Sequence, residues 1–171
     1  MQAKPPIAAA PFAIRAAELR DVGAIVGLIR ELAEFEQLAH LVQATPEKLR
    51  PQLFGERPAA EALVVDVDTD AGREVVGFAL FFPNFSTFLA QPGLYLEDLY
   101  VRPAQRGKGI GEALLKRLGR LAVERGCGRF EWSVLDWNTD AIRFYERMGA
   151  ILMPDWRICR VSGAALERFR G

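Results

Sequence analysis

The stretch that decides the fold is Val101-Arg102-Pro103-Ala104-Gln105-Arg106-Gly107-Lys108-Gly109-Ile110-Gly111. It follows an apolar segment, Leu94–Val101, that predicts a strand, and it opens an amphipathic segment that predicts a helix. Glycines at three alternate positions let the backbone approach a ligand closely. The first turn of a helix presents free N–H groups and the positive end of the helix dipole. The stretch therefore predicts an anion-binding turn, with Arg106 and Lys108 as cations beside it.

Two common phosphate-binding motifs do not match this turn. The string GxxxxGK[ST] of the Walker A loop is absent, and the alternate spacing of Gly107, Gly109 and Gly111 does not fit GxGxxG. The turn alone leaves other interpretations open. It could bind a nucleotide phosphate in another way, or it could be a glycine-rich connection that binds no ligand.

Elsewhere the periodicity predicts alternating strands and helices. Expected strands are Phe12–Ala16, Leu63–Val67, Val75–Phe82 and Arg129–Leu135, with two short ones around Ile151 and at Arg157–Val161. Two helices are expected to begin after the caps Asp21 and Thr45, a third to run from Ile110 to Gly126, and a fourth to cover Ala141–Met148. A helical turn is expected at Ala164–Phe169. The segment Asn84–Gly93 is expected to be a loop. The alternation predicts a layered sheet with helices on both faces.

Composition and charge narrow the function classes. The 171 residues fit one domain at 12–171 after a flexible tail at 1–11. Lys plus Arg and Asp plus Glu are both 22, so the zero net charge argues against a nucleic-acid binder. No segment is apolar for long enough to be a signal peptide or a membrane span, which predicts a cytoplasmic protein that does not bind membranes. The two cysteines and single histidine do not form a zinc motif, so no metal is expected.

Two adjacent acids interrupt the apolar strand Leu94–Val101. Alternation would put Glu97 and Asp98 on opposite faces, and unpaired acids in an apolar strand are costly. A carboxylate at such a place can bind an ammonium group and accept its proton. The alternative explanation of the pair is an edge strand or a salt bridge.

The glycine-rich turn and the segments around it resemble one family. The likeness is carried by Tyr95–Val101, Arg106–Gly111, Trp137-Asn138 and Phe144–Ala150, and more weakly by Leu28–Glu36. In order and spacing these resemble the GNAT N-acetyltransferases, and more narrowly the branch of spermidine/spermine and thialysine acetyltransferases. The resemblance covers nearly the whole chain after residue 11. It implies an α/β (α+β layered) GNAT fold with a mixed, mostly antiparallel, splayed sheet, and a homodimer.

The resemblance also implies acetyl-CoA as cosubstrate. The residues expected to contact it are Leu99, Tyr100, Val101, Arg106, Gly107, Lys108, Gly109, Ile110, Gly111, Glu112 and Asn138. Asn138 could instead, or in addition, cap the helix that follows it. A bulge or a splay is expected near Leu99, where the strand would supply backbone groups to the thioester and the pantetheine arm.

The resemblance assigns the catalytic roles. Glu97 is the implied base, and Tyr145 the implied acid that protonates the leaving thiolate, a transfer uphill by about 2 kcal/mol. Without the resemblance, Tyr145 would be interpreted as a core residue. Phe35, Glu36, Glu97 and Asp98 are the implied acceptor contacts, and Phe35 replaces the tyrosine usual in this branch, which puts the identity of the acceptor in doubt. Glu31, Glu34 and Asp136 could extend an acidic lining, or lie on solvated faces.

These observations predict direct acetyl transfer, in a ternary complex, to a primary amine of a small polyamine or a lysine-like diamino acid. One alternative is a GNAT enzyme acting on a protein lysine or an aminoglycoside. Another is a non-catalytic module that binds acyl-CoA and regulates a partner. The presence of both Glu97 and Tyr145 argues against the second alternative.

Overall fold

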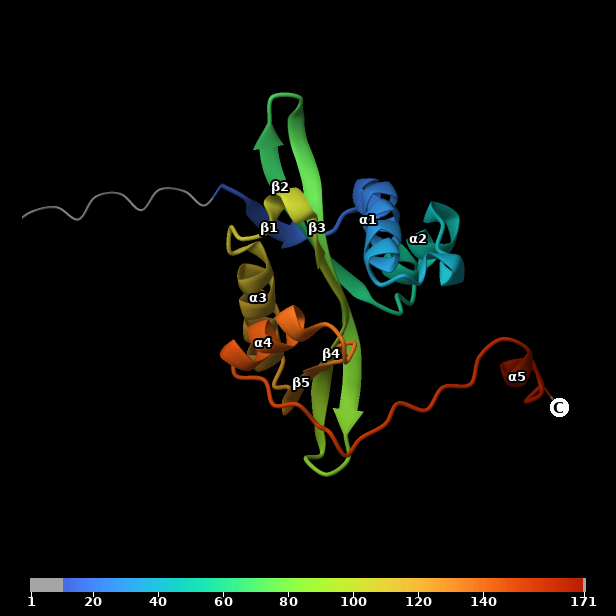
Figure 1. Ribbon diagram of the computed structural model, residues 1–171. Helices are drawn as coiled ribbons and strands as arrows, with labels where there is room; N and C mark the ends of the chain where they lie inside the picture. The colour runs from blue at the N-terminus through green and yellow to red at the C-terminus, as the bar shows by residue number, and fades with distance from the viewer. Residues whose placement is uncertain (1–10, 171) are drawn as a thin grey trace, which may run out of the picture. The chain divides into compact units, whose positions relative to one another are not determined.

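Residues 11–170 are described in a computed structural model (Figure 1), so the expected tail lies outside the described residues except for Pro11. The chain forms two compact units that divide after Ser133. The single domain predicted for 12–171 stays a prediction. The first unit contains β1 (Ala13–Ala16), α1 (Val22–Phe35), α2 (Pro46–Phe54), β2 (Glu61–Thr69), β3 (Gly72–Ser86), β4 (Gln91–Val101), α3 (Ile110–Glu124) and β5 (Arg129–Trp132), with short 3-10 turns at Leu19–Asp21, Ala39–Leu41 and Pro103–Gln105.

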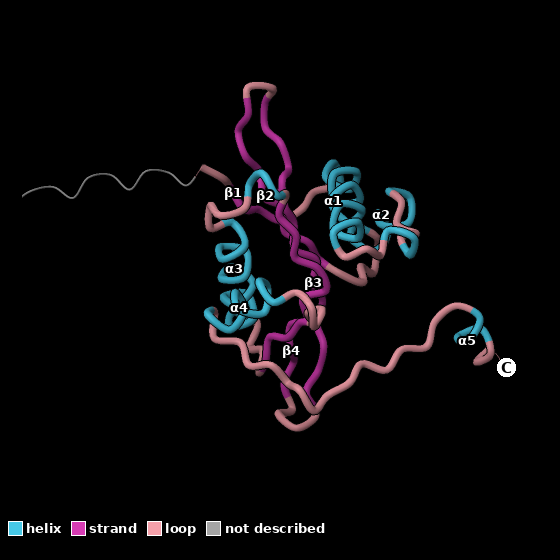
Figure 2. Tube along the Cα trace, viewed as in Figure 1, coloured by secondary structure: helices cyan, strands magenta, loops and turns pink. Residues whose placement is uncertain are grey.

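The first unit is built on one five-stranded sheet in the order β1-β2-β3-β4-β5. The first four strands pair antiparallel, and β5 pairs parallel with β4 after the crossover through α3. Helices α1 and α2 lie on one side of the sheet and α3 on the other (Figures 1 and 2). This confirms the predicted mixed, mostly antiparallel sheet with helices on both faces.

Apolar side chains at helical spacing hold α1 against the sheet. Ile25 and Leu28 are fully buried in a cluster with Val64, Phe78 and Tyr100. Burying side chains of this size stabilises the fold by about 1.5–3 kcal/mol each. The packing fixes the course of α1, and therefore the position of its C-terminal end relative to β4.

The predicted helix cap Asp21 has a different partner. Its side chain makes no capping bond to α1, and instead accepts a hydrogen bond from Arg15 Nη1 at 2.6 Å. Arg15 Nε also donates to Asp66 at 2.7 Å. Both carboxylates are buried, and the guanidinium holds the pKa of Asp21 below its usual range. A buried carboxylate requires such a counter-ion, so this pairing prevails over capping. Thr45 does cap α2, as predicted.

The expected loop at Asn84–Gly93 is mostly strand. β3 continues to Ser86 and β4 begins at Gln91, so only Thr87–Ala90 forms the turn, with Ala90 at φ 51°. The prediction was wrong because Asn84, Phe85 and Ser86 find partners on the facing strand, which a local pattern does not show.

The second unit, as far as Arg170, contains two helices, α4 (Thr139–Arg147) and α5 (Ala164–Glu167). The helix predicted at Ala141–Met148 is confirmed with slightly earlier bounds. The strands predicted around Ile151 and at Arg157–Val161 are wrong, since residues 151–163 adopt no strand. A strand needs a hydrogen-bonded partner, and the described part of this unit contains none.

Candidate active site

A bulge interrupts the pairing of β3 with β4 at Glu97. Leu80 pairs with Asp98 and Phe81 pairs with Leu96, so Glu97 is the extra residue. A bulge re-aims side chains and disrupts the ladder locally. The prediction of a bulge in this strand is therefore confirmed, although it lies two residues before Leu99.

Strand β4 loses its parallel neighbour at the same point. β5 pairs with β4 only from Gly93 to Leu96, so residues 97–101 extend past the end of that ladder. Val101 O accepts a hydrogen bond from Arg106 Nε at 2.8 Å. The expected splay is thus present, and it leaves one backbone edge of Leu99 and Tyr100 without a described strand beside it.

Three carboxylates gather at the bulge, and we call Glu36, Glu97 and Asp98 the acidic cluster. Glu97 is exposed, whereas Asp98 and Glu36 are half-buried. Burial raises the pKa of Asp98 to about 6, and the charges of Glu97 and Glu36 contribute to this rise. Burial also raises the pKa of Glu36.

No lysine or arginine among residues 11–170 forms an ion pair with the acidic cluster. Like charges held together at partial burial are unfavourable unless a cation joins them. The cluster is therefore chemically suited to bind a ligand that carries ammonium groups.

The other acids of the expected lining are arranged differently. Arg102 donates to Glu31, with Nη2 at 2.9 Å and Nε at 3.0 Å from Oε1, and it also pairs with Glu74. Glu31 is thus neutralised within the protein, while Glu34 is exposed. Asp136 belongs to the second unit. Sequence reasoning missed Arg102, because nothing local signals a partner that lies 71 positions away.

The glycine-rich turn has the conformation that the sequence predicts. Gly107 and Gly109 have φ values of 75° and 78°, which side-chain-bearing residues rarely adopt. Gly109 is the N-cap of α3 and has no capping side chain. Apart from the chain neighbours, no atom of the described residues lies within 4 Å of the position that a side chain at either glycine would occupy. The turn therefore leaves open space in front of a helix N-terminus, and fits a pyrophosphate group.

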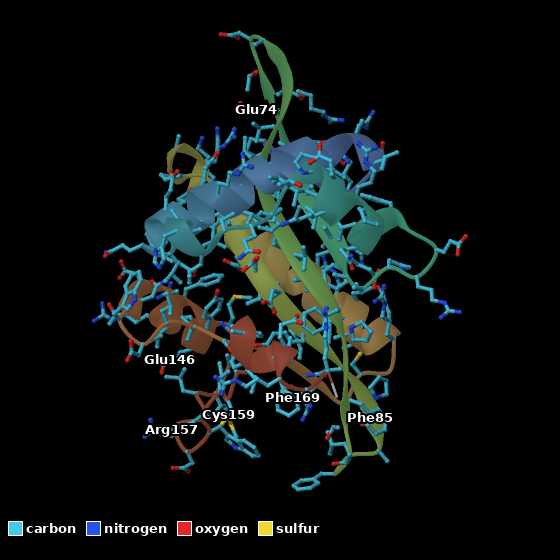
Figure 3. All side chains as sticks on the ribbon, turned by 90° about the vertical axis from the view of Figure 1, so that its right-hand side faces the viewer. Glu74, Phe85, Glu146, Arg157, Cys159 and Phe169 are labelled. Atoms are coloured by element: carbon cyan, nitrogen blue, oxygen red, sulfur yellow. The ribbon has the colours of Figure 1, made fainter. Side chains whose placement is uncertain are left out.

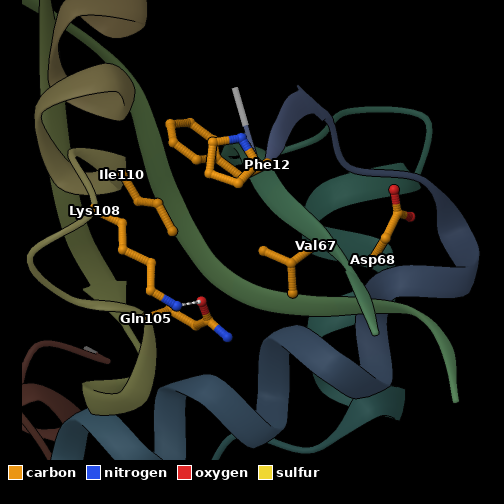
Figure 4. A pocket seen from close by; sticks show the side chains of 7 residues that line it. Phe12, Val67, Asp68, Gln105, Lys108 and Ile110 are labelled. Atoms are coloured by element: carbon orange, nitrogen blue, oxygen red, sulfur yellow. Dashed lines mark hydrogen bonds between the residues drawn. The ribbon is translucent and has the colours of Figure 1, made fainter. Parts of the chain in front are cut away.

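Lys108 lies beside this turn. Its Nζ donates to Gln105 Oε1 at 2.7 Å. Both side chains line a shallow pocket of about 180 Å³ together with Ile110, Phe12 and Val67 (Figure 4). Its lining combines apolar side chains with one cation, Lys108, and one acid, Asp68, so it differs in character from the acidic cluster.

Arg106 turns its side chain toward α1 and β4. Its guanidinium carbon lies 5.1 Å from the centroid of the Phe35 ring and 5.4 Å from that of Tyr100. Rings at these distances attract the cation. Among the described residues no carboxylate pairs with Arg106, so its charge stays available to an anion.

In the second unit, Asn138 caps α4. Its Oδ1 accepts a hydrogen bond from the Ala141 N–H at 3.3 Å, which confirms the capping role. Tyr145 lies on α4, half-buried, with its ring centroid 5.2 Å from that of Phe144. Because the two units are described separately, the roles of Asn138 and Tyr145 toward a cosubstrate stay predictions.

A comparison with protein families identifies the chain. Residues 25–150 match the model of the acetyltransferase (GNAT) family. The chain belongs to the GNAT family. This acetyltransferase is 39% identical over 165 residues to a thialysine N-epsilon-acetyltransferase of Mus musculus, covering 92% of this chain and 96% of that protein. It is 37% identical over 195 residues to an L-ornithine N5-acetyltransferase of Arabidopsis thaliana, covering 90% and 86%.

Solved structures agree with the fold of this GNAT protein. An integron cassette protein from V. cholerae superposes with a TM-score of 0.74 at 27% identity, covering 92% of this chain and 96% of that one. A ribosomal-protein-alanine N-acetyltransferase from Brucella melitensis gives 0.68 at 27% identity, covering 89% and 99%. Within residues 11–170, no helix is long and apolar enough to cross a membrane, and no group of three or more His, Cys, Asp or Glu side chains is placed to hold a metal ion.

Proposed function

We propose that this GNAT acetyltransferase transfers the acetyl group of acetyl-CoA to a primary amine of a small polyamine or a lysine-like diamino acid. The observation that carries the proposal is the acidic cluster at the β4 bulge, which has no counter-ion within the described chain. Its relatives include proteins named for thialysine and ornithine, both of which carry an amine on a side chain.

The turn Arg106–Gly111, together with the backbone N–H of Glu112 in the first turn of α3, would hold the pyrophosphate, since its glycines, Lys108 and the α3 N-terminus fit an anion. The open edge of β4 at Leu99–Val101 would receive the amide groups of the pantetheine arm. Acetyl-CoA, when bound, supplies the thioester. Asn138, already the cap of α4, would add a polar contact.

Glu97 would accept a proton from the acceptor ammonium, whose free pKa is about 10.4 and which must be neutral to attack. The C–N bond would form as the C–S bond breaks, and the Tyr145 hydroxyl would give its proton to the departing sulfur. The second proton that the acceptor nitrogen loses on becoming an amide would replace the one that Tyr145 gave. Asp98 and Glu36 would hold a second ammonium group. Phe35, at the end of α1, would form the apolar side of the acceptor site.

The proposal is tested by measuring CoA release from acetyl-CoA with a panel of acceptors. The panel contains spermidine, spermine, putrescine, thialysine, lysine, ornithine, an aminoglycoside and a histone-tail peptide. We expect turnover with a small diamine or diamino acid. Turnover with only the peptide or the aminoglycoside would overturn the acceptor assignment, and tight acetyl-CoA binding with no turnover would favour a non-catalytic module.

We also propose a homodimer. Large apolar side chains in residues 151–169 are exposed, among them Ile151, Trp156 and Phe169, and Figure 3 labels Phe169 in this unit. Apolar groups at this density, left uncovered by their own unit, are typical of a surface that another surface buries, and the proposal assigns that role to a second copy of the chain. Light scattering after size-exclusion chromatography would give about twice the chain mass of 19.0 kDa. A monomer at micromolar concentration would contradict the proposal.

A cytoplasmic location stays a prediction from the sequence.

A further inference from the structure

We infer that Arg106 is a positioning residue that couples the glycine-rich turn to the end of α1, so that CoA bound at the turn fixes one wall of the acceptor site. The inference rests on the proposed function, because it assumes that the turn holds CoA. It concerns the contact of the Arg106 side chain with the exposed ring of Phe35, which lies outside the buried core cluster.

The first step is the path of the Arg106 side chain. The residue stands at the start of the turn, directly before Gly107, but its Nε donates to Val101 O on β4. Its guanidinium then lies over Phe35, the last residue of α1. One side chain thus contacts three elements: the turn, the open end of β4 and the end of α1.

The second step concerns how firmly the C-terminal turn of α1 is held. The packed part of α1 is buried as far as Ala33, whereas Phe35 is 43% exposed. Terminal helical turns fray unless side chains hold them. Phe35 directly precedes Glu36, a member of the acidic cluster, so any contact that holds the ring also positions a carboxylate that would face the acceptor.

The third step is charge. Arg106 is held by two rings and a carbonyl oxygen and by no carboxylate within residues 11–170. An anion bound at the turn would therefore pair with the guanidinium of Arg106 and immobilise it. By excluding water, the anion would also strengthen the contact between this guanidinium and the Phe35 ring. Coupling between two binding sites is reciprocal. We expect bound CoA to tighten amine binding by about 2- to 5-fold through this contact.

Hydrogen exchange with free CoA as the probe tests the inference without turnover. In the unaltered protein, CoA should slow exchange in the segment 107–113 and also, by about 2- to 5-fold, in the segment 28–36. Phe35→Leu should keep the slowing at 107–113, and a CoA Kd within twofold, but lose the slowing at 28–36. Phe35→Tyr retains a ring and should restore it.

Phe54 provides a matched control. It is the last residue of α2, is 38% exposed, and makes no ring contact with Arg106. Phe54→Leu should leave the CoA-dependent slowing at 28–36 intact. In binding measurements with an acceptor from the panel, free CoA should lower the amine Kd of the unaltered protein by about 2- to 5-fold, and Phe35→Leu should lose this dependence on CoA whatever its own effect on the amine Kd.

Two failures can be told apart. If CoA slows exchange at 107–113 but not at 28–36, or if Phe35→Leu keeps both effects, the coupling is refuted and the turn still binds CoA. If calorimetry detects no CoA binding and neither segment responds, the proposed function itself is overturned.

Discussion

The glycine-rich turn follows strand β4 and two members of the acidic cluster, Glu97 and Asp98, lie on that strand, but the two sites are suited to their ligands by different means. The turn offers backbone N–H groups, a helix dipole and glycines with positive φ. The cluster offers side chains whose charge depends on burial and on each other. The first kind of site survives most substitutions outside the glycines, whereas the second can be lost by changing one carboxylate. Substitutions should therefore separate cofactor binding from amine chemistry.

The largest expected effect comes from removing the proposed base. Glu97→Gln should lower kcat/KM for the amine by about 100-fold or more, because the acceptor nitrogen then loses its proton acceptor. The Kd for acetyl-CoA should stay within twofold. Glu124→Gln, an exposed acid on α3, is the control and should behave like the unaltered protein. Full activity of Glu97→Gln would remove Glu97 from the mechanism.

Tyr145→Phe should lower turnover by about 100-fold while leaving acetyl-CoA binding near its original strength, since only the proton donor is lost. Stopped-flow measurement of CoA release, together with calorimetry for binding, checks both halves. An unchanged turnover would show that the thiolate is protonated by another group.

A substitution in the glycine-rich turn should instead weaken CoA binding. Gly109→Ala places a side chain at φ 78°, which costs about 1–2 kcal/mol, so CoA binding should weaken by about 10-fold. Gly119→Ala is the matched control within α3, with open space for the added carbon, and should leave the CoA Kd unchanged. If Gly109→Ala instead alters only the amine KM, the division between the two sites fails.

The smallest effect on activity is expected at Asp98. Its pKa of about 6 means that amine binding should weaken as the pH falls through 6, and Asp98→Asn should remove this dependence while raising the amine KM by about 5-fold. The amine KM measured from pH 5 to 8 gives the answer. A profile that keeps the same inflection in Asp98→Asn would assign it to another group.

The same substitution, Asp98→Asn, should weaken amine binding but stabilise the folded protein at high pH. An acid whose pKa is raised on folding favours the folded state below its unfolded pKa, and this contribution is lost as the pH rises through the folded value. Raising the pKa from 3.8 to about 6 corresponds to about 3 kcal/mol. Urea unfolding should therefore show Asp98→Asn to be more stable at pH 8 by up to about that amount, and equal in stability near pH 3.

The sequence predicts the turn better than the cluster, for a physical reason. The glycines, the strand before them and the helix after them are adjacent along the chain, so local patterns determine the turn. The bulge depends on the register between β3 and β4, which placed it at Glu97 rather than near Leu99. The pairing of Arg102 with Glu31 needs the whole fold, and no local pattern reveals it.

The parallel ladder between β4 and β5, only four residues long, has a consequence for handling the protein. An open strand edge is a template on which a second chain can pair. If the pantetheine arm occupies this edge in the working enzyme, preparations without CoA leave it uncovered. Storage with free CoA should then slow precipitation, so that a substrate fragment serves as a preservative.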